Sequence, residues 1–147
     1  MKNAKLLTLL LVALVFNLSS CNKDEDEPTP ISAKTEFLTD QKWKISKIDF
    51  NGVDVSDESK YPDVADVKST QIKFDKDGTY TQTRTSGTET GNWKFTDNET
   101  HLLFGPNPSE QHDWEIVELD ADSFIGTSTF TYEDGPLDVR VELVHAQ

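Results

Sequence analysis

The sequence predicts an all-β protein: an eight-stranded antiparallel up-and-down β-barrel with a short N-terminal helical turn. Two observations predict this fold. From Gln41 onward, apolar and polar residues alternate with a period of two, and turn signals recur roughly every 8–12 residues. Most connections are short, which makes successive strands antiparallel neighbours, and eight such strands close into a barrel without a free edge.

The elements follow in order along the chain. A helical turn over 33–38 comes first, with Phe37 and Leu38 as an apolar plug. The Asp77-Gly78 pair marks a tight hairpin between two strands. The eight strands are expected over 42–50, 70–75, 79–85, 90–96, 100–104, 112–119, 123–132 and 137–145.

The first strand changes parity within its length. Trp43 and Ile45 share one face. Ile48 and Phe50 have the opposite parity, so a β-bulge is expected near residues 46–47.

A set of inward-facing apolar residues is expected to form the core. The connection over 53–67 is long for a compact domain, which is typical of a functional or mobile segment, here either a lid or a docking loop. The residues expected to be largely buried are Trp43, Ile72, Phe74, Trp93, Phe95, Val139 and Val141.

Several of these segments carry a resemblance to one family. They are the first strand with Trp43-Lys44-Ile45, the hairpin 72–80, the strand 91–95, and the pair 114–119 and 123–126. In these segments the chain resembles the lipocalin-like domain family of small bacterial lipoproteins, over most of residues 41–144. Gln41 stands where lipocalins usually carry the glycine of Gly-x-Trp. The resemblance implies a barrel fold and no settled activity.

The N-terminal segment has the layout of a secretory signal peptide. Lys2 and Lys5 precede an apolar run over 6–16, which is too short to span a bilayer. Leu18-Ser19-Ser20-Cys21 resembles the lipobox of bacterial lipoproteins, which implies cleavage before Cys21 and a lipid on its sulfur. The alternative is an ordinary signal peptide with a chance cysteine. Cys21 is the chain's one cysteine, which favours lipidation and excludes a disulfide framework.

Three segments are therefore expected: a signal peptide over 1–20, a lipidated Cys with a disordered acidic tether over 21–33, and a lipocalin-like barrel domain over 34–147. The tether contains four consecutive acids, 24–27, and prolines, which keep such a segment extended. An acidic run after the lipidated cysteine resembles the export tag of certain Gram-negative surface lipoproteins. It implies an outer-membrane location facing the cell exterior, and the periplasmic face is the alternative.

The charge balance excludes one class of partner. The chain has 14 Lys and Arg against 27 Asp and Glu, and two of the basic residues, Lys2 and Lys5, belong to the signal peptide. The remainder carries a net charge of about −15, which repels the phosphate backbone of nucleic acids. It also repels anionic head groups, so the membrane partner is held through the lipid on Cys21.

The sequence predicts no catalytic residues, no metal site and no cofactor, and hence no enzyme. Asp75-Lys76-Asp77-Gly78 has its glycine too early for an EF-hand loop and fits a hairpin turn. His101, His112 and His145 belong to different strands without the spacing of a zinc site. The chain also lacks the Gly-x-Ser-x-Gly motif of a nucleophilic serine.

A ligand cavity is expected inside the barrel. On strand 79–85 two polar residues, Gln82 and Arg84, share the inward parity of Tyr80, and on strand 123–132 Gly126 and Ser128 leave space. Such a cavity suits a small amphipathic molecule with an acidic group near Arg84. The predicted ligand-binding residues are Trp43, Tyr80, Gln82, Arg84, Trp93 and Phe130.

The sequence leaves open the role of Arg84, of three aromatic residues and of the protein as a whole. Arg84 either binds an anion, reaches solvent at the rim, or pairs with Glu89 across the turn. The aromatic residues Trp43, Tyr80 and Trp93 either face a ligand or form plain core. Two functions follow: a barrel that binds a small amphipathic or hydrophobic ligand, or a non-enzymatic interaction module, such as an accessory subunit or inhibitor, whose partner is an envelope protein.

Overall fold

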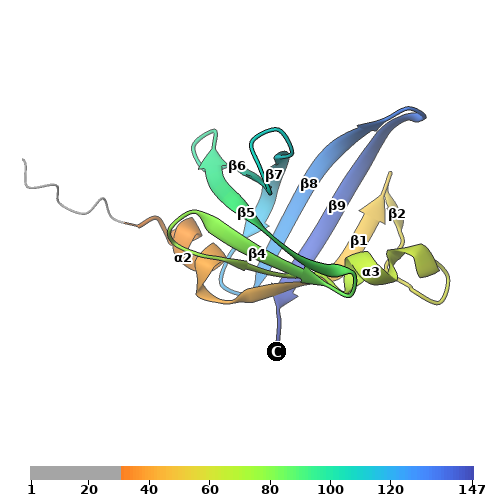
Figure 1. Ribbon diagram of the computed structural model, residues 1–147, viewed down its shortest axis with the longest axis horizontal. Coiled ribbons are helices and arrows are strands. Elements are labelled where there is room, and N and C mark those ends of the chain that lie inside the picture. The colour runs from red at the N-terminus through yellow and green to blue at the C-terminus, as the bar shows by residue number, and fades with distance from the viewer. Residues whose placement is uncertain (1–30) are drawn as a thin grey trace, which may run out of the picture. The chain divides into compact units, whose positions relative to one another are not determined.

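The computed structural model describes residues 31–147; the predicted signal peptide, Cys21 and the tether up to Pro30 lie outside these residues. Eight strands form a closed antiparallel sheet in which sequence neighbours pair and the last strand pairs with the first (Figure 1). This confirms the predicted eight-stranded up-and-down barrel. The strands are β1 (Lys42–Phe50), β3 (Gln71–Phe74), β4 (Thr79–Arg84), β5 (Gly87–Thr96), β6 (His101–Gly105), β7 (His112–Leu119), β8 (Ser123–Tyr132) and β9 (Gly135–His145).

The strand limits follow the expected ones closely. The predicted bulge in β1 is confirmed, because the register of β1 against β9 shifts between Ile45 and Lys47. Two strands begin earlier than expected. Gly87 starts β5 with a φ of 152°, and Gly135 starts β9 with a φ of 117°, so each strand begins directly after a tight turn.

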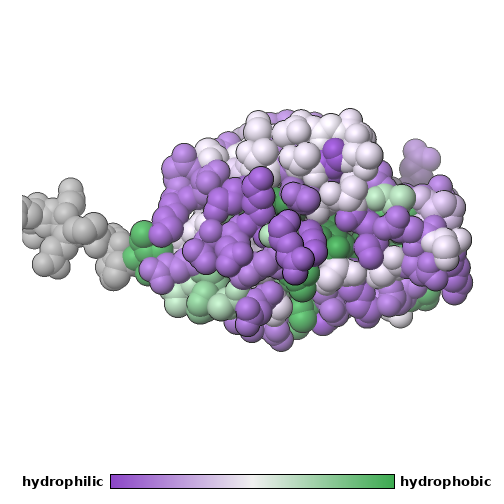
Figure 2. Space-filling model, turned by 90° about the horizontal axis from the view of Figure 1, so that it is seen from below, coloured by the Kyte–Doolittle hydropathy of each residue, from purple (hydrophilic) through white to green (hydrophobic). Residues whose placement is uncertain are grey.

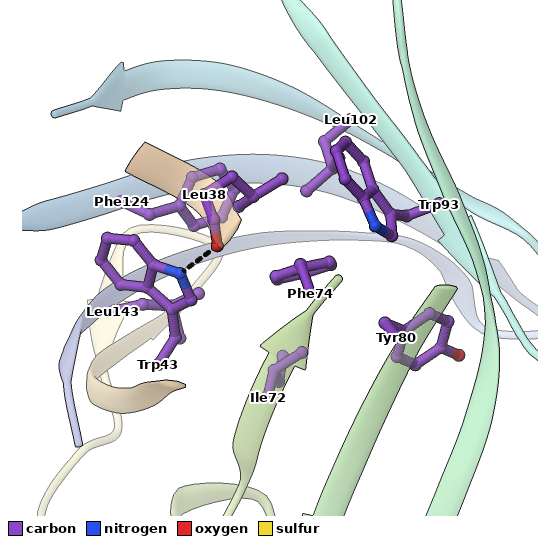
Figure 3. Packing of buried hydrophobic residues seen from close by; sticks show 9 residues of the cluster. All are labelled: Leu38, Trp43, Ile72, Phe74, Tyr80, Trp93, Leu102, Phe124 and Leu143. Atoms are coloured by element: carbon purple, nitrogen blue, oxygen red, sulfur yellow. Dashed lines mark hydrogen bonds between the residues drawn. The ribbon is translucent and has the colours of Figure 1, made fainter. Parts of the chain in front are cut away.

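One end of the barrel is closed by the helix α2 (Ala33–Asp40). The Ser32 side chain caps this helix by accepting a hydrogen bond from the backbone N–H of Thr35. Leu38 is fully buried, and its carbonyl oxygen accepts a 2.9 Å hydrogen bond from the Trp43 Nε1 (Figure 3). Leu38 therefore provides the predicted plug, whereas Phe37 is only half-buried.

The main core lies next to this closed end. Six of the seven expected core residues are buried, and Phe95 is the exception. Phe95 is half-buried because it lies near the turn to β6, at the margin of the barrel, where it packs edge-on against Trp93. The buried cluster is Leu38, Trp43, Ile72, Phe74, Tyr80, Trp93, Leu102, Phe124 and Leu143 (Figure 3).

The long connection between β1 and β3 folds against the other end of the barrel. It contains β2 (Val53–Asp54), which pairs with the end of β1, the 3-10 turn η1 (Pro62–Val64) and the short helix α3 (Ala65–Lys68). Val55 and Val64 pack on Ile48 in a second, smaller cluster. The Asp66 carboxylate accepts hydrogen bonds of 2.8 Å each from the backbone N–H and the hydroxyl of Ser86, which ties α3 to the β4–β5 turn.

The outer face of the domain in Figure 2 carries mostly hydrophilic side chains, with small apolar patches between them. Within residues 31–147, no helix combines the length and the apolar character that a membrane span requires.

Candidate ligand cavity

The barrel encloses a cavity of about 550 Å³. Side chains from all eight strands line it, together with Val67 and Thr70 from the connection before β3. The lining residues Arg84, Glu89 and His112 are exposed, so the cavity opens to solvent at the end opposite α2. Its volume lies within the range of about 300–1,000 Å³ that is typical of small-molecule sites.

Three adjacent strands, β8, β9 and β1, make an apolar wall. The bulge in β1 places Ile48 and Phe50 on the same side as Ile45, so all three face the cavity. The predicted inward face of β9 is also confirmed. The wall consists of Phe124, Phe130, Tyr132, Leu137, Val139, Val141, Leu143, Ile45, Ile48 and Phe50.

The polar lining groups on the other side come from β4, from β5 and from the residue directly before β3. Gln82 on β4 lies directly across from Glu89 on β5, and Thr70 immediately precedes β3. The exposed fraction is 2% for Thr70 and 7% for Gln82, so these two polar side chains lie well below the surface. Within the described residues, the Thr70 Oγ1 has no hydrogen-bond partner.

Tyr80 and Glu89 form a polar pair in this region. The Tyr80 hydroxyl donates a 2.7 Å hydrogen bond to the Glu89 Oε1. Burial, followed by the hydrogen bond to the Glu89 carboxylate, raises the pKa of the Tyr80 phenol well above its usual value. The Tyr80 phenol therefore stays protonated at any physiological pH. Its hydroxyl remains the donor of the hydrogen bond that holds the Glu89 carboxylate in place.

Gln82 and Arg84 form a second pair. In the amide orientation that satisfies both side chains, the Gln82 oxygen accepts hydrogen bonds from the Arg84 Nη2 (2.6 Å) and Nε (3.0 Å). The Gln82 NH₂ group then remains as a donor. The Arg84–Glu89 pair, one of the alternatives left open by the sequence, does not form in this structure, because the Gln82 amide engages Arg84 and the Tyr80 hydroxyl engages Glu89. Arg84 itself is exposed at the rim.

The structure brings together four of the six residues predicted for the site. Tyr80, Gln82, Arg84 and Phe130 line the cavity. Trp43 and Trp93 do not line it, which corrects the sequence interpretation. Both indoles lie in the core cluster, where Nε1 donates to the backbone carbonyl of Leu38 and of Asp75, respectively, at 2.9 Å. Their strand parity is inward, but the closed end leaves no space beside them.

The sequence interpretation missed the two lining residues that carry an unpaired buried polar atom. Trp114 on β7 stacks on Phe104 at 6.3 Å between ring centroids and lies 5.9 Å from Phe130, edge to face. Its Nε1 is buried and has no partner within the described residues. Thr70 shares the inward parity of Ile72 and Phe74, so alternation in 70–75 was a signal for it. Alternation does not show that a hydroxyl is unpaired.

The space expected beside Gly126 is occupied by aromatic rings. A Cβ atom on Gly126 would lie 3.0 Å from the Phe124 Cζ and 3.4 Å from the Trp114 Cε3. Ser128 donates a 2.7 Å hydrogen bond to the Asp113 carbonyl and does not line the cavity. The glycine therefore makes room for core side chains of the barrel instead of a ligand.

The histidines lie apart. His101 contacts Asp113 at 3.2 Å, His112 packs on Phe130, and His145 packs on Trp43. Across residues 31–147, no group of three His, Cys, Asp or Glu side chains is arranged to hold a metal ion. The Asp77 carboxylate accepts hydrogen bonds from the backbone N–H and hydroxyl of Thr79, in the hairpin turn that the sequence predicts.

The fold and the cavity together define a closed eight-stranded β-barrel compatible with ligand binding. No family model matches the chain, and no curated protein matches it. Among solved structures, the chain is similar to the crystal structure of a DUF4847 family protein from Bacteroides vulgatus, with a TM-score of 0.54 and 14% sequence identity. The match covers 76% of this chain and 96% of that one. At this identity the likeness shows the fold alone.

Proposed function

We propose that the barrel binds a small amphipathic or hydrophobic molecule in its central cavity. One observation carries the proposal: a cavity of about 550 Å³ has mainly apolar walls and a few polar side chains placed below its rim. Small-molecule sites combine these features, because apolar walls supply affinity and a few polar groups fix orientation. A barrel that served only as a scaffold would bury apolar side chains at the positions of Thr70 and Gln82.

Trp114 provides the means to test the proposal. It is the one tryptophan of the described residues that lines the cavity, whereas Trp43 and Trp93 lie in the core. Titration with palmitate or with 1-anilinonaphthalene-8-sulfonate is expected to change tryptophan emission. Trp114→Phe should remove most of this change, and the matched variant Trp93→Phe should retain it.

The outcome separates the two functions that the sequence leaves open. If neither probe nor a panel of fatty acids and aromatic acids binds, the carrier proposal is wrong. A protein that co-purifies with the domain at fixed stoichiometry from membranes, while the cavity stays empty, would instead support an interaction module.

The same proposal includes the N-terminal segment. A signal peptide over 1–20 that ends in Leu18-Ser19-Ser20, directly before Cys21, supports a lipoprotein of the lipocalin-like type, without enzymatic activity, held in the outer membrane by lipid on Cys21. The acidic run 24–27 supports display on the cell exterior.

Two variants test this location. Cys21→Ser should release the protein from the membrane fraction or leave it unprocessed, and palmitate labelling that persists in Cys21→Ser would refute lipidation there. Deletion of residues 24–27 should reduce digestion by protease added to whole cells. Unchanged digestion would refute the export-tag interpretation.

A further inference from the structure

The buried polar residues of the cavity, Thr70 and Gln82, lie on one side of it, opposite an apolar wall. His112 and Glu110 are exposed polar lining residues at and just before β7, and the Trp114 indole N–H also belongs to β7. In a ring of eight strands, the strand four places away is on the far side. Around the sheet order, β4 therefore faces β8, and β5 faces β9. The polar side is formed by β4 and β5, with Gln82, Arg84 and Glu89, and by Thr70 just before β3. The lining residues of β8 and β9 opposite are mainly Phe, Leu and Val.

The polar side chains are spread over an area of the cavity wall and do not cluster at one position. Gln82 and Arg84 are two residues apart on one strand, which separates them by about 7 Å along the barrel. Gln82 and Glu89 belong to the adjacent strands β4 and β5, and Thr70 directly precedes the next strand, β3, which spreads the three residues over roughly 10 Å across it. The area also extends inward from the rim, since Thr70 and Gln82 are both buried while Arg84 is exposed.

These groups retain hydrogen-bonding capacity. The Thr70 hydroxyl has no partner within the described residues. The Gln82 NH₂ group is directed away from Arg84 when its oxygen accepts from that residue. Glu89 uses one oxygen for Tyr80 and keeps the other as an acceptor. A buried polar group without a partner destabilises the protein, so the arrangement fits a ligand that supplies the missing partners.

We infer that the ligand is a rigid molecule with two unlike faces: an apolar face that packs on β8 and β9, and an opposite face with hydroxyl groups that bond Thr70, Gln82 and Glu89. A carboxylate at its outer end lies near Arg84. This inference rests on the proposed function and narrows the ligand class. A single-chain amphiphile such as a fatty acid has its polar group at one end, so it would leave Thr70 and Gln82 unpaired.

Calorimetric titration with a matched pair of fused-ring acids tests the inference. Cholate carries its hydroxyl groups on one face of the ring system. Lithocholate has the same rings and carboxylate with a single hydroxyl, and palmitate serves as the single-chain probe. The protein is expected to bind cholate about tenfold more tightly than lithocholate, although lithocholate is the more hydrophobic of the two.

Substitutions on the polar side should remove this preference. Thr70→Val and Gln82→Leu are expected to bring the affinities for cholate and lithocholate to within about threefold of each other. Thr83→Val is the matched control, because Thr83 is an exposed residue of the same strand β4 with outward parity. If Gln82→Leu does not fold, Thr70→Val still tests the inference. The Thr70 hydroxyl has no hydrogen-bond partner within the described residues, so the substitution breaks no hydrogen bond there.

The outcomes distinguish the two-faced ligand from the proposed carrier function on which it rests. If lithocholate or palmitate binds as tightly as cholate, or if Thr83→Val changes the preference as much as Thr70→Val, the two-faced ligand is refuted and the carrier function stands. If cholate, lithocholate and palmitate all fail to bind, both are refuted.

Discussion

The closed end of the barrel and its cavity differ in how their indole and hydroxyl groups are paired. At the closed end, Trp43 and Trp93 each donate their indole N–H to a backbone carbonyl, and the Thr39 hydroxyl donates to the Thr35 carbonyl. In the cavity lining, the buried Thr70 hydroxyl and Trp114 Nε1 have no partner within the described residues. At the closed end, the His145 Nε2 beside Trp43 is the one such buried side-chain atom of the described residues. Satisfied polar groups stabilise a core, whereas unsatisfied ones cost stability unless a ligand completes them. The closed end therefore holds the fold, and the open half is compatible with ligand binding.

The largest expected effect is at the closed end. Trp43→Ala should lower the free energy of unfolding by about 3–5 kcal/mol, because it removes a fully buried indole and the hydrogen bond to Leu38. Phe130→Ala, at a half-buried position of the open half, should cost roughly 1 kcal/mol. Urea unfolding measures both. Equal losses would contradict the contrast between the two ends.

The second-largest expected effect is a loss of stability at the boundary between the closed end and the open half of the barrel. β5 pairs with β6 only over Asn92–Thr96, so residues 87–91 of β5 pair with β4 alone. At this boundary a Cβ on Gly91 would lie 2.2 Å from the Gly105 carbonyl oxygen. Gly91→Ala should therefore destabilise by about 1–3 kcal/mol in urea unfolding. Thr90→Ala, at the exposed neighbouring position, is the control and should change stability much less.

A pair of threonines isolates the difference in hydrogen bonding. Thr39→Val should destabilise the protein by about 1 kcal/mol, because Thr39 loses its 2.7 Å hydrogen bond to Thr35. Thr70→Val should stabilise the ligand-free protein by about 1 kcal/mol, because it replaces a buried unpaired hydroxyl with a methyl group. Thermal unfolding without ligand measures both. A loss of stability in Thr70→Val would mean that its hydroxyl is satisfied in solution.

The smallest expected effect is the acid response of the contact between α3 and the β4–β5 turn. Hydrogen bonds from the Ser86 hydroxyl and backbone N–H lower the pKa of the Asp66 carboxyl below its usual value. A lowered pKa in the folded state contributes stability above pH about 4, and that stability is lost as the pH falls through the folded-state pKa. Asp66→Asn should therefore flatten the decline of Tm below pH about 4, in a series of thermal unfolding curves. An identical decline in wild type and variant would refute this contribution.

The sequence by itself determined the strands and their faces. Alternation is a local property, because successive side chains of a strand point to opposite sides. It therefore sufficed to place Tyr80, Gln82 and Arg84 on the inner face, to place β9 with its valines inward, and to locate the bulge near Ser46-Lys47. The single cysteine and the apolar N-terminal run likewise support the lipoprotein prediction from the sequence alone.

Only the tertiary structure decided which inward residues are packed and which line a cavity. Trp43 and Trp93 share the inward parity of Tyr80 and Phe130, yet α2 and the surrounding core fill the space beside them. The distance of a residue from the end closed by α2 depends on the tilt of the strands and on where α2 docks. Neither can be derived from the alternation of side chains along a strand. Pairing is likewise a property of the assembled barrel. The Tyr80 hydroxyl finds its partner, Glu89, on the neighbouring strand β5, whereas no group of the described residues reaches the Thr70 hydroxyl. The polar area opposite the apolar wall therefore appears only when β4–β5 and β8–β9 face each other across the closed sheet.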